Sequence, residues 1–542
     1  MRLRLALAIS LLAGLVAGCQ LNHAAAPGAA APAANPGLQP LRALDTRPNV
    51  VVVMTDDETV ADMAVMPKTR RLIGGQGVTF DQSYVSYSLC CPSRATYLTG
   101  RYAHNHRVLG LTPPLGGYAK FARLNGGDTL PVWLERSGYR TAHIGKYLNG
   151  YGDPRGGPAK PPAGWSEWHG TVDPTTYRMW GYRMFDHGRL RQYGSQFDEN
   201  PALYQTDVFG HFARDFIARN AGPGRPFFLS VAFLAPHHEG ARIRVHYGHV
   251  VRPAPRNRGA LDGRPMQPAA GFDERNTSDK PRFLQRIYRP LTAVQKRDVL
   301  AQQHDRQESL LAVDDQVSRL VESLRRTGEL DNTYILFTSD NGYMQGEHRV
   351  AYGKMLAYDP STRVPLLLRG PGIPHGAVSH ELVANIDLAP TIAAVAGARP
   401  TRPCDGRSLV PFARHPGRLT NRPLLHETAA VAPVAAIAQN VKDASSLLAD
   451  ARAAQDERGR PVYPALPYSA IRTRRWLYIH WTNGAEELYD RQRDPGQLRS
   501  LALVPVYRPV VVQLRRQLTA LARCKGAACS AAKPPVPPPA GQ

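Results

Sequence analysis

Several short segments of this chain are apolar at almost every position, and this restricts the folds that the chain can adopt. The segments are 49–55, 141–145, 226–235, 334–338 and 364–368. Strands that are covered on both faces show this pattern, whereas half-exposed strands alternate with polar residues. Segments with apolar residues at helical spacing occur at 310–326 and 387–396, each followed by a glycine. Buried strands that alternate with helices predict an α/β fold built on an open parallel sheet.

Polar residues follow these segments at the points where the strands should end. The residues are Asp56, Asp57, Lys146, His237, Asp340 and Asn341. Ligands of open α/β sheets bind outside the carboxyl ends of the strands, so these side chains should lie close together. The Asp and Asn oxygens suit Ca²⁺ or Mg²⁺ better than zinc. The alternative is turn formation, because Asp and Asn also end strands by bonding nearby backbone.

A cysteine pair opens the segment 90–101, which reads Cys-Cys-Pro-Ser-Arg-Ala-Thr-Tyr-Leu-Thr-Gly-Arg. Pro92 fits the first turn of a helix, where its missing N–H has no cost. A helix N-terminus favours an anion or a nucleophile. Cys90 or Cys91 is therefore a candidate nucleophile, with Arg94 on the same helical turn. Two buried structural thiols are the alternative.

This segment resembles the maturation signature of the type I sulfatases, Cys-x-Pro-Ser-Arg followed by Leu-Thr-Gly-Arg. Further motifs similar to that family occur in its order at 49–57, 145–147, 235–237, 339–342, 363–366, 387–391, 405–409 and 488–490. The likeness covers roughly residues 46–525, and its details resemble N-acetylglucosamine-6-sulfatases and bacterial arylsulfatases. The resemblance implies an alkaline-phosphatase-like α/β fold. Its mixed, mostly parallel sheet is flanked by helices, and a smaller antiparallel sheet subdomain follows.

The resemblance also implies an activity, the hydrolysis of sulfate esters such as aryl sulfates or N-acetylglucosamine 6-sulfate. A formylglycine-generating enzyme oxidises Cys90 in this interpretation, and the hydrated aldehyde supplies the nucleophile. A Ca²⁺ ion, with Mg²⁺ as the alternative, would be held by modified Cys90, Asp56, Asp57, Asp340 and Asn341. The sulfate would be surrounded by Arg94, Lys146, His237 and Lys354.

Some residues of the site depart from the common family pattern or leave a role open. His237 or Lys354 would protonate the leaving alcohol. Position 148 is Leu, where many sulfatases have His, although the N-acetylglucosamine-6-sulfatases look similar to this chain here. His348 is either a further contributor to the site or a surface residue.

Two other functions are considered beside the sulfatase interpretation. One is a phosphodiesterase or phosphonate monoester hydrolase, some of which carry the same cysteine motif. The other is a non-catalytic lipoprotein that binds sulfated glycans and never converts Cys90. The net charge of +23 requires an anionic partner. No zinc-finger, basic-zipper or RNA-binding pattern accompanies it, so nucleic acid is excluded and a sulfated small molecule or glycan is favoured.

The amino-terminal segment is typical of an exported bacterial lipoprotein. Residues 1–18 read as a signal peptide, with two arginines before an apolar run at 5–16 that is too short to span a bilayer. Residues 16–19 resemble a lipobox, which predicts lipidation of Cys19 and attachment to the membrane; an ordinary signal peptide is the alternative. Residues 19–45 form an Ala- and Pro-rich tether.

The rest of the chain is divided by its composition. We predict a catalytic domain at 46–425, an irregular connection at 426–467, a C-terminal sheet subdomain at 468–525 and a disordered tail at 526–542. The subdomain should contain a hairpin, with one strand at 470–481 and another at 486–490, and a helix at 501–521. Outside the cytosol, Cys524 and Cys529 are a plausible disulfide pair.

Basic residues are concentrated in two segments. Segment 240–298 follows His237 and is suited to steer a polyanionic substrate toward the site, and segment 500–542, which has no acidic residue, is suited to contact anionic lipid.

Overall fold

The structure is a computed structural model, and it describes residues 45–536 except 154–158, 187, 198, 240–249, 265–267 and 430–465. The predicted signal peptide, the lipidation at Cys19 and nearly all of the tether lie outside the described residues. Most of the predicted connection at 426–467 does so as well.

The core of the fold is an eight-stranded sheet. Its order is β11 (Ala377–Ser379), β2 (Val78–Phe80), β10 (Leu366–Arg369), β9 (Thr333–Ser339), β1 (Asn49–Thr55), β8 (Phe227–Ala232), β4 (Arg140–Gly145) and β5 (Glu167–Gly170). The five strands from β9 to β5 are mutually parallel, whereas β10 runs antiparallel to both of its neighbours. The predicted mixed, mostly parallel sheet is confirmed. Because β10 runs the other way, Arg369 lies at the opposite edge from the ends of β1 and β9.

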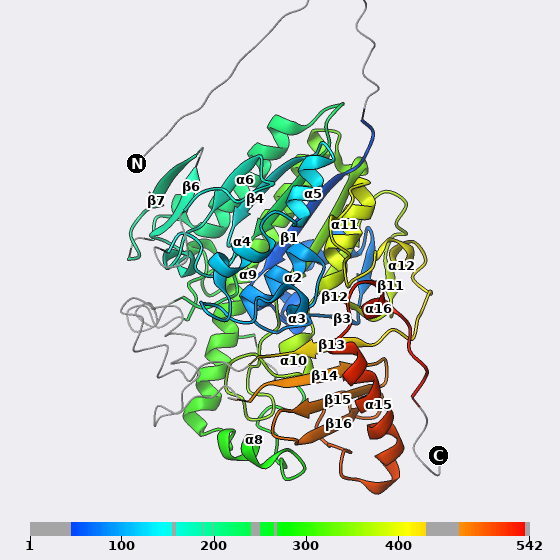
Figure 1. Ribbon diagram of the computed structural model, residues 1–542. Helices are drawn as coiled ribbons and strands as arrows, with labels where there is room; N and C mark the ends of the chain where they lie inside the picture. Colours follow the sequence, from blue (N-terminus) through cyan, green and yellow to red (C-terminus); the bar gives the residue numbers. More distant parts are fainter. Residues whose placement is uncertain are drawn as a thin grey trace, which may run out of the picture. The chain divides into compact units, whose positions relative to one another are not determined.

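Both faces of the sheet are covered by helices, as the apolar segments indicate (Figure 1). Val51 and Val53 of β1 belong to the apolar cluster that includes α6 (Gln205–Asn220) and α9 (Ala293–Arg326). Val50 and Val52 point to the other face. The helices packed there are α2 (Cys90–Thr99), α4 (Gly117–Asn125), α5 (Leu130–Arg136), α11 (Leu388–Ala396) and α12 (Val410–Arg414).

Helix α9 is much longer than the predicted segment 310–326. It begins at Ala293, where Thr292 and Gln295 form a capping box. Residues 305–309 of this helix are polar or charged at every position, yet all are buried. A pattern of apolar residues cannot reveal this part of a helix, because the buried face there is built from polar side chains.

A second, four-stranded antiparallel sheet lies below the first in Figure 1. Its order is β13 (Leu424–Glu427), β14 (Tyr468–Arg472), β15 (Trp476–Trp481) and β16 (Glu486–Asp490), and α15 (Arg508–Leu521) packs on it. The predicted single strand at 470–481 is wrong, because the chain turns between β14 and β15. Residues 426 and 427, which belong to the predicted connection, lie in this sheet as the end of β13.

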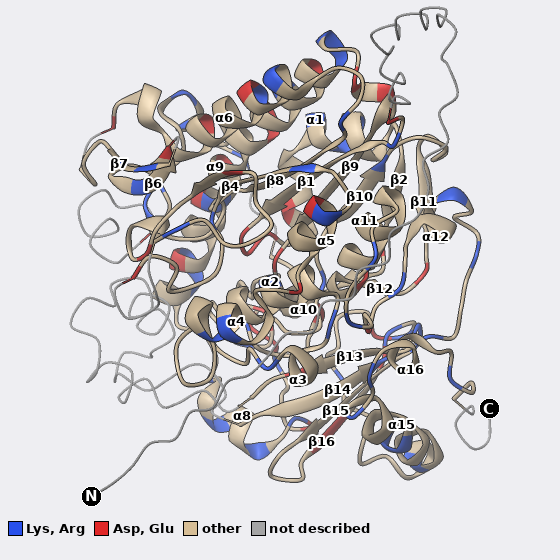
Figure 2. Ribbon diagram, turned by 45° about the horizontal axis from the view of Figure 1, so that its top comes forward, with Lys and Arg blue, Asp and Glu red and all other residues tan. Residues whose placement is uncertain are grey.

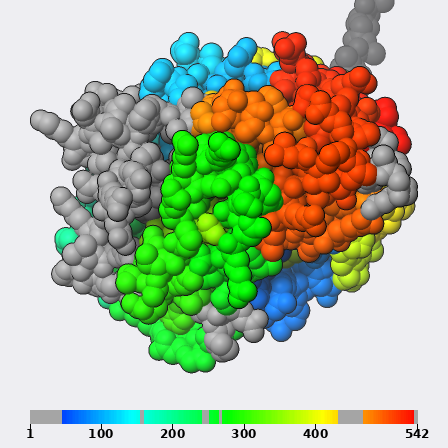
Figure 3. All heavy atoms as spheres, turned by 90° about the horizontal axis from the view of Figure 1, so that it is seen from below, coloured from blue at the N-terminus to red at the C-terminus, as the bar shows by residue number. Residues whose placement is uncertain are grey.

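The segment before α9 packs against this second sheet. From below, residues near 280–290 lie beside the C-terminal region (Figure 3). Lys280 donates a hydrogen bond to the carbonyl of Gln497, and the ring of Phe283 meets that of Trp481 edge-on.

The C-terminal segment is ordered by contacts that its composition does not reveal. The structure places a disulfide between Cys524 and Cys529, and α16 (Ala527–Ser530) follows Gly526, whose N–H donates to Asp405. The predicted disordered tail is therefore wrong for residues 526–530. Beyond them the Lys533 N–H donates to the carbonyl of Asn421, and Gln517 donates to the carbonyl of Pro534. Residues 537–542 lie outside the described chain.

The remaining elements are short. They are α1 (Pro67–Thr69), β3 (Ser83–Tyr84), α3 (Ala103–His106), β6 (Tyr182–Asp186), β7 (Arg189–Tyr193), α8 (Arg282–Ile287), α10 (Asp359–Thr362) and β12 (Val383–Ala384). Among the described helices, none combines the length and the apolar character needed to cross a bilayer.

Candidate active site

Four neighbouring parallel strands end at the same place and bring their polar residues together there. Strand β1 leads to Asp56 and Asp57, β9 to Asp340 and Asn341, β8 to His237 and β4 to Lys146. All of these side chains are almost completely buried. The structure thus brings together the residues that the strand ends single out, and Cys90, Arg94 and Lys354 join them from outside the sheet.

Asp57 is the centre of the acidic part of this cluster. Its Oδ1 accepts hydrogen bonds from Asn341 Nδ2 and Lys354 Nζ, both at 2.5 Å. Its N–H donates to Asp340 Oδ1 at 3.2 Å. The backbone of Asp57 has a φ of 68°, a left-handed conformation that aspartate tolerates better than most residues. This conformation turns the chain sharply after β1, so that Asp56 and Asp57 both remain in the cluster.

The donor atoms of the cluster fit a divalent cation. One ligand atom from each of Asp56, Asp57, Cys90 and His237 lies within 4.8 Å of all the others. The buried Asn341 Oδ1 has no hydrogen-bond partner among the described residues, as expected of an atom that faces a cation. Carboxylate and amide oxygens suit a hard ion. Asp340 is not one of these four residues; it is linked to them by the Asp57 N–H, which donates to its Oδ1, and by Arg94, whose Nε donates to its Oδ2 at 2.7 Å.

Cys90 and Cys91 point into different surroundings. Cys90 is the first residue of α2, and its Sγ lies 3.0 Å from Lys354 Nζ and 3.4 Å from Asp56 Oδ1. Burial and the Asp56 carboxylate raise the pKa of the Cys90 thiol well above its usual range. Cys91 belongs to the apolar core, where burial raises its pKa to about 12. Of the two candidate nucleophiles, only Cys90 lies among the site residues.

Three cationic side chains balance the three carboxylates. Arg94 donates to Asp340 and to the carbonyl of Lys146 at 2.8 Å, and its second terminal nitrogen lies 3.3 Å from Asp56. Lys146 pairs with Asp56, and Lys354 pairs with Asp57. Burial opposes the charged form of Lys146, but the Asp56 carboxylate outweighs it and raises the lysine's pKa. The cluster is therefore formally neutral while it contains three fixed positive charges beside Cys90.

His237 turns one ring nitrogen toward the cluster. Its Nδ1 lies 2.8 Å from the carbonyl of His238, which can only accept, so Nδ1 carries the hydrogen. Nε2 then lies 3.7 Å from Asp57 Oδ2. A ring oriented in this way can exchange a proton at Nε2 with a group bound at the centre of the cluster.

Two residues of the site are not visible in the sequence patterns. The Tyr177 ring lies 4.5 Å from Lys146 Nζ and 4.9 Å from the His237 ring, so it covers both. Arg306 of α9 donates to the carbonyls of Asp57 at 2.5 Å and Pro236 at 3.1 Å, and its guanidinium stacks on Tyr343. Tyr177 ends the short 3₁₀ helix η3 (Thr175–Tyr177), whose surroundings in the sequence show no apolar periodicity. In the sequence, Arg306 can be recognised as a charged residue on the same helix face as the apolar residues Leu310 and Val313.

The structure shows what surrounds Leu148, which departs from the common pattern, and His348, whose role is open. Leu148 is buried in the apolar core. His348 is also buried, with Nδ1 2.7 Å from Glu274 Oε2 and its ring against Tyr358. Of the two alternatives for His348, the surface position is therefore wrong.

Comparison with known proteins shows that this chain is similar to sulfatases. The family model described as "Sulfatase" matches residues 48–398. Human N-acetylglucosamine-6-sulfatase is 37% identical over 385 residues, which is 69% of this chain and 66% of that protein. An extracellular sulfatase homologue of Drosophila melanogaster is 32% identical over 68% of this chain and 32% of its own length. The chain thus spans less than two thirds of the length of these relatives.

Two solved structures share the fold. One is a complex of a protein with its substrate D-glucosamine-2-N,6-O-disulfate, with a TM-score of 0.65, 22% identity and coverage of 87% of this chain and 97% of the other. The second is the phosphonate monoester hydrolase of Agrobacterium radiobacter, with a TM-score of 0.62, 22% identity and coverage of 87% and 95%.

Proposed function

Because this chain belongs to the sulfatase family, we propose that it hydrolyses sulfate esters at the cluster around residue 90. The observation that carries the proposal is the position of Cys90. Its side chain lies at the start of a helix and between a carboxylate and an ammonium group, 3.4 Å from Asp56 and 3.0 Å from Lys354. An exported enzyme of this kind acts outside the cytosol.

The proposed roles follow from the charges and contacts of the side chains. Oxidation of Cys90 to formylglycine by a formylglycine-generating enzyme supplies, after hydration, a hydroxyl nucleophile. A divalent cation, proposed as Ca²⁺, would be held by Asp56, Asp57, Asp340, Asn341 and the modified Cys90 and would supply Lewis acidity.

The chain's own side chains do the rest. Arg94, Lys146 and Lys354 bind the sulfate oxygens and stabilise the charge that develops on them. The proton that the departing alcohol needs comes from Nε2 of His237 in its imidazolium form, which carries a hydrogen on both ring nitrogens; Nε2 is the ring atom directed into the cluster. With Nδ1 fixed on the carbonyl of His238, the ring keeps this orientation throughout.

The proposed substrate is a sulfated amino sugar, with simple aryl sulfates as further substrates. The support is the identity of 37% to human N-acetylglucosamine-6-sulfatase. A phosphonate or phosphodiester hydrolase is the competing activity, and the shared fold at 22% identity does not favour it over a sulfatase.

Paired substrates distinguish these activities. We expect kcat/KM for 4-nitrophenyl sulfate to exceed the values for 4-nitrophenyl phosphate and a phenylphosphonate ester by at least about tenfold, about 1.4 kcal/mol in the transition state. Initial rates with the three esters at one pH measure this ratio. A preference for either phosphorus ester would replace the sulfatase proposal by the phosphonate or phosphodiester hydrolase.

Removal of divalent cations should abolish turnover and leave the fold largely intact. The carboxylates of Asp56 and Asp57 already have Lys146 and Lys354 as partners, so folding does not require the metal. After chelation, Ca²⁺ should restore more activity than Mg²⁺, because a ligand set of this size suits the larger ion. Elemental analysis gives the bound metal, and circular dichroism reports the fold. Full activity of a metal-free sample would exclude the proposed metal role.

We also propose that the mature protein is attached to the membrane by a lipid on Cys19. The support is the apolar run at 5–16 followed by a lipobox-like sequence. Cell fractionation and labelling with radioactive fatty acid test this proposal. The wild-type chain should remain with the membrane fraction and carry radiolabelled acyl groups, and a chain with Cys19→Ala should not.

A further inference from the structure

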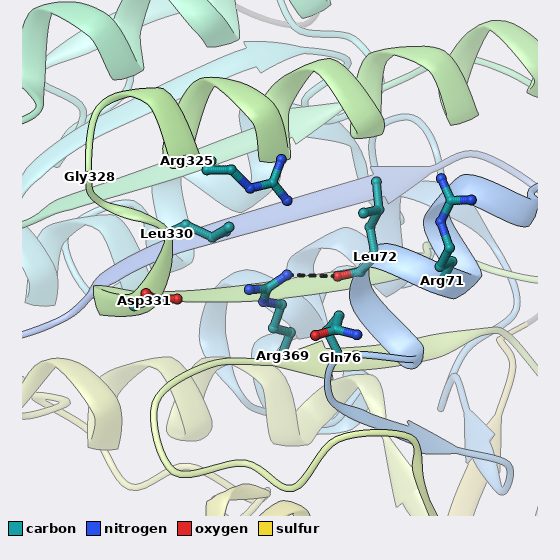
Figure 4. A pocket seen from close by; sticks show the side chains of 8 residues that line it. All are labelled: Arg71, Leu72, Gln76, Arg325, Gly328, Leu330, Asp331 and Arg369. Atoms are coloured by element: carbon teal, nitrogen blue, oxygen red, sulfur yellow. Dashed lines mark hydrogen bonds between the residues drawn. The ribbon is translucent and has the colours of Figure 1, made fainter.

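A basic cavity lies at the edge of the large sheet opposite to the candidate active site. Its volume is about 550 Å³, and its charged lining comes from three separate parts of the fold. Arg71 precedes β2, Arg325 lies in the last turn of α9, and Arg369 ends β10. Figure 4 shows Arg325, Leu330, Arg369 and Leu72 grouped together, with Arg71 beyond Leu72; the two leucines contribute apolar surface to the lining.

The charges of this cavity are only partly balanced. Arg325 pairs with Glu322, and Arg369 donates one hydrogen bond to the carbonyl of Leu72 at 3.1 Å. Arg71 is exposed and forms no ion pair within the described part of the chain. Asp331 is the one carboxylate in the lining. Burial lowers the pKa of Arg369, with Asp331 and Arg325 acting on it in opposite directions. An anion in the cavity would therefore gain from three guanidinium groups.

The chain enters the sheet at the same edge. Asn49, the first residue of β1, is aligned with Thr333 of β9, and Arg369 is aligned with Ile335 of the same strand. Just before β1, Arg47 is held in place by the carbonyls of Ser137 at 2.8 Å and Ala396 at 3.0 Å. The first described residues of the chain thus lie at the same edge of the sheet as Arg369. Figure 2 turns this edge toward the reader.

The active site lies at the far end of the same strands. Strand β1 has seven residues, so the two edges are separated by about 23 Å at ~3.3 Å per residue. If the basic edge contacts a membrane, the site faces away from it.

We propose that the cavity formed by Arg71, Arg325 and Arg369 binds the phosphate headgroup of an anionic membrane lipid and so orients the enzyme on the membrane surface. The shape of the site suits this ligand, because Leu72 and Leu330 offer apolar contact beside the three charges. The proposal rests on the proposed lipid anchor for its biological setting, but the binding itself can be measured without the anchor or the catalytic activity.

The other basic segment, 500–542, is a weaker candidate for this contact. Arg515 of α15 is paired with Glu486, and no residue of this segment lines the basic cavity. Helix α15 also packs on the second sheet, at the bottom of Figure 1, whereas β1 enters from the top. This segment provides the matched control.

Sedimentation with vesicles tests the proposal on the full chain carrying Cys19→Ala, which removes the acyl anchor. We expect binding to vesicles of phosphatidylglycerol and phosphatidylcholine and much weaker binding to phosphatidylcholine alone. The triple variant Arg71→Gln, Arg325→Gln, Arg369→Gln should lower the partition coefficient by about two orders of magnitude. The control Arg508→Gln, Arg516→Gln, Arg523→Gln should change it less than about twofold.

Several results would overturn the proposal. One is equal binding of the triple variant and the parent chain to the anionic vesicles, and another is a loss of binding in the control variant instead. Selective loss of binding to a sulfated polysaccharide, with vesicle binding unchanged, would assign the cavity to a glycan. Competition by inorganic phosphate alone, again with unchanged vesicle binding, would make it a free-anion site.

Folding and activity are checked separately. All variants should hydrolyse a soluble aryl sulfate at the parent rate, since none of the changed residues belongs to the active site. If the triple variant does not fold, the double variant Arg71→Gln, Arg325→Gln changes only exposed side chains and should still weaken vesicle binding at least tenfold. A parent chain without sulfatase activity would refute the proposed function and leave the vesicle result valid.

Discussion

Replacing Cys90 by alanine is expected to abolish sulfate ester hydrolysis, with a loss of at least about four orders of magnitude in kcat, as for other catalytic nucleophiles. The side chain of residue 90 is the one that reaches the carboxylates and Lys354 from the start of α2. No other cysteine of the described chain lies in the cluster, so none can replace it. Turnover of 4-nitrophenyl sulfate measures the effect.

Cys91→Ala is the matched control. This thiol packs in the apolar core, so its replacement should cost stability, about 1 kcal/mol or more, and leave most of the activity. Mass spectrometry of the peptide containing residue 90 should show an aldehyde in the parent protein. An unmodified thiol in catalytically active protein would exclude the formylglycine mechanism. An active Cys90→Ala protein beside an inactive Cys91→Ala protein would show that the other cysteine is the functional one.

Arg306→Gln is expected to lower kcat by about two orders of magnitude, although Arg306 itself does not touch the reacting groups. Its guanidinium holds the carbonyls of Asp57 and Pro236, the residue before His237. A glutamine side chain cannot bridge both carbonyls, and a buried carbonyl left without a partner costs about 1–3 kcal/mol. Displacement of Asp57 and His237 by about 1 Å is sufficient for a hundredfold loss.

The positioning role predicts effects that a general loss of stability does not. Affinity for Ca²⁺, measured by calorimetry, should fall together with kcat, because Asp57 is a proposed ligand, while KM changes less. Arg306→Lys should recover part of both, since lysine keeps the charge but not the planar pair of donors.

The matched variant is Arg422→Gln. It removes an equally buried arginine that pairs with Asp387, away from the cluster. It should lower the melting temperature without a loss of Ca²⁺ affinity. Equal losses of affinity in both variants would show that Arg306 acts through stability alone.

The sequence predicts the site well where a residue follows directly from a strand. Segments such as 49–55 and 334–338 are apolar on both faces, which predicts parallel neighbours in an α/β sheet. Parallel neighbours end at the same edge, and Asp56, Asp57, Asp340 and Asn341 are brought together there. The direction of β10 cannot be predicted in this way. Its apolar residues are equally buried in either direction, and only the pairing with β9 and β2 determines on which edge Arg369 lies.

Residues that act through buried polar contacts are not visible in such patterns. Arg306 belongs to a helix segment whose buried face is polar, so apolar spacing does not identify it. Tyr177 reaches Lys146 and His237 from a single 3₁₀ turn. The choice between Cys90 and Cys91 likewise depends on the direction in which the first turn of α2 faces. Because the two residues are adjacent and identical, the sequence does not reveal which of them points into the site. These features are fixed by long-range contacts.

The burial of Cys90 sets an order of events in the life of the protein. Its side chain is 1% exposed, and Lys354, which lies 3.0 Å from it, is supplied by a segment far later in the chain. No second enzyme can reach the sulfur once that segment has closed over it. The proposed oxidation must therefore take place on the incompletely folded chain, before Asp340 and Lys354 arrive. A molecule that folds before it is modified would remain inactive for as long as it stays folded.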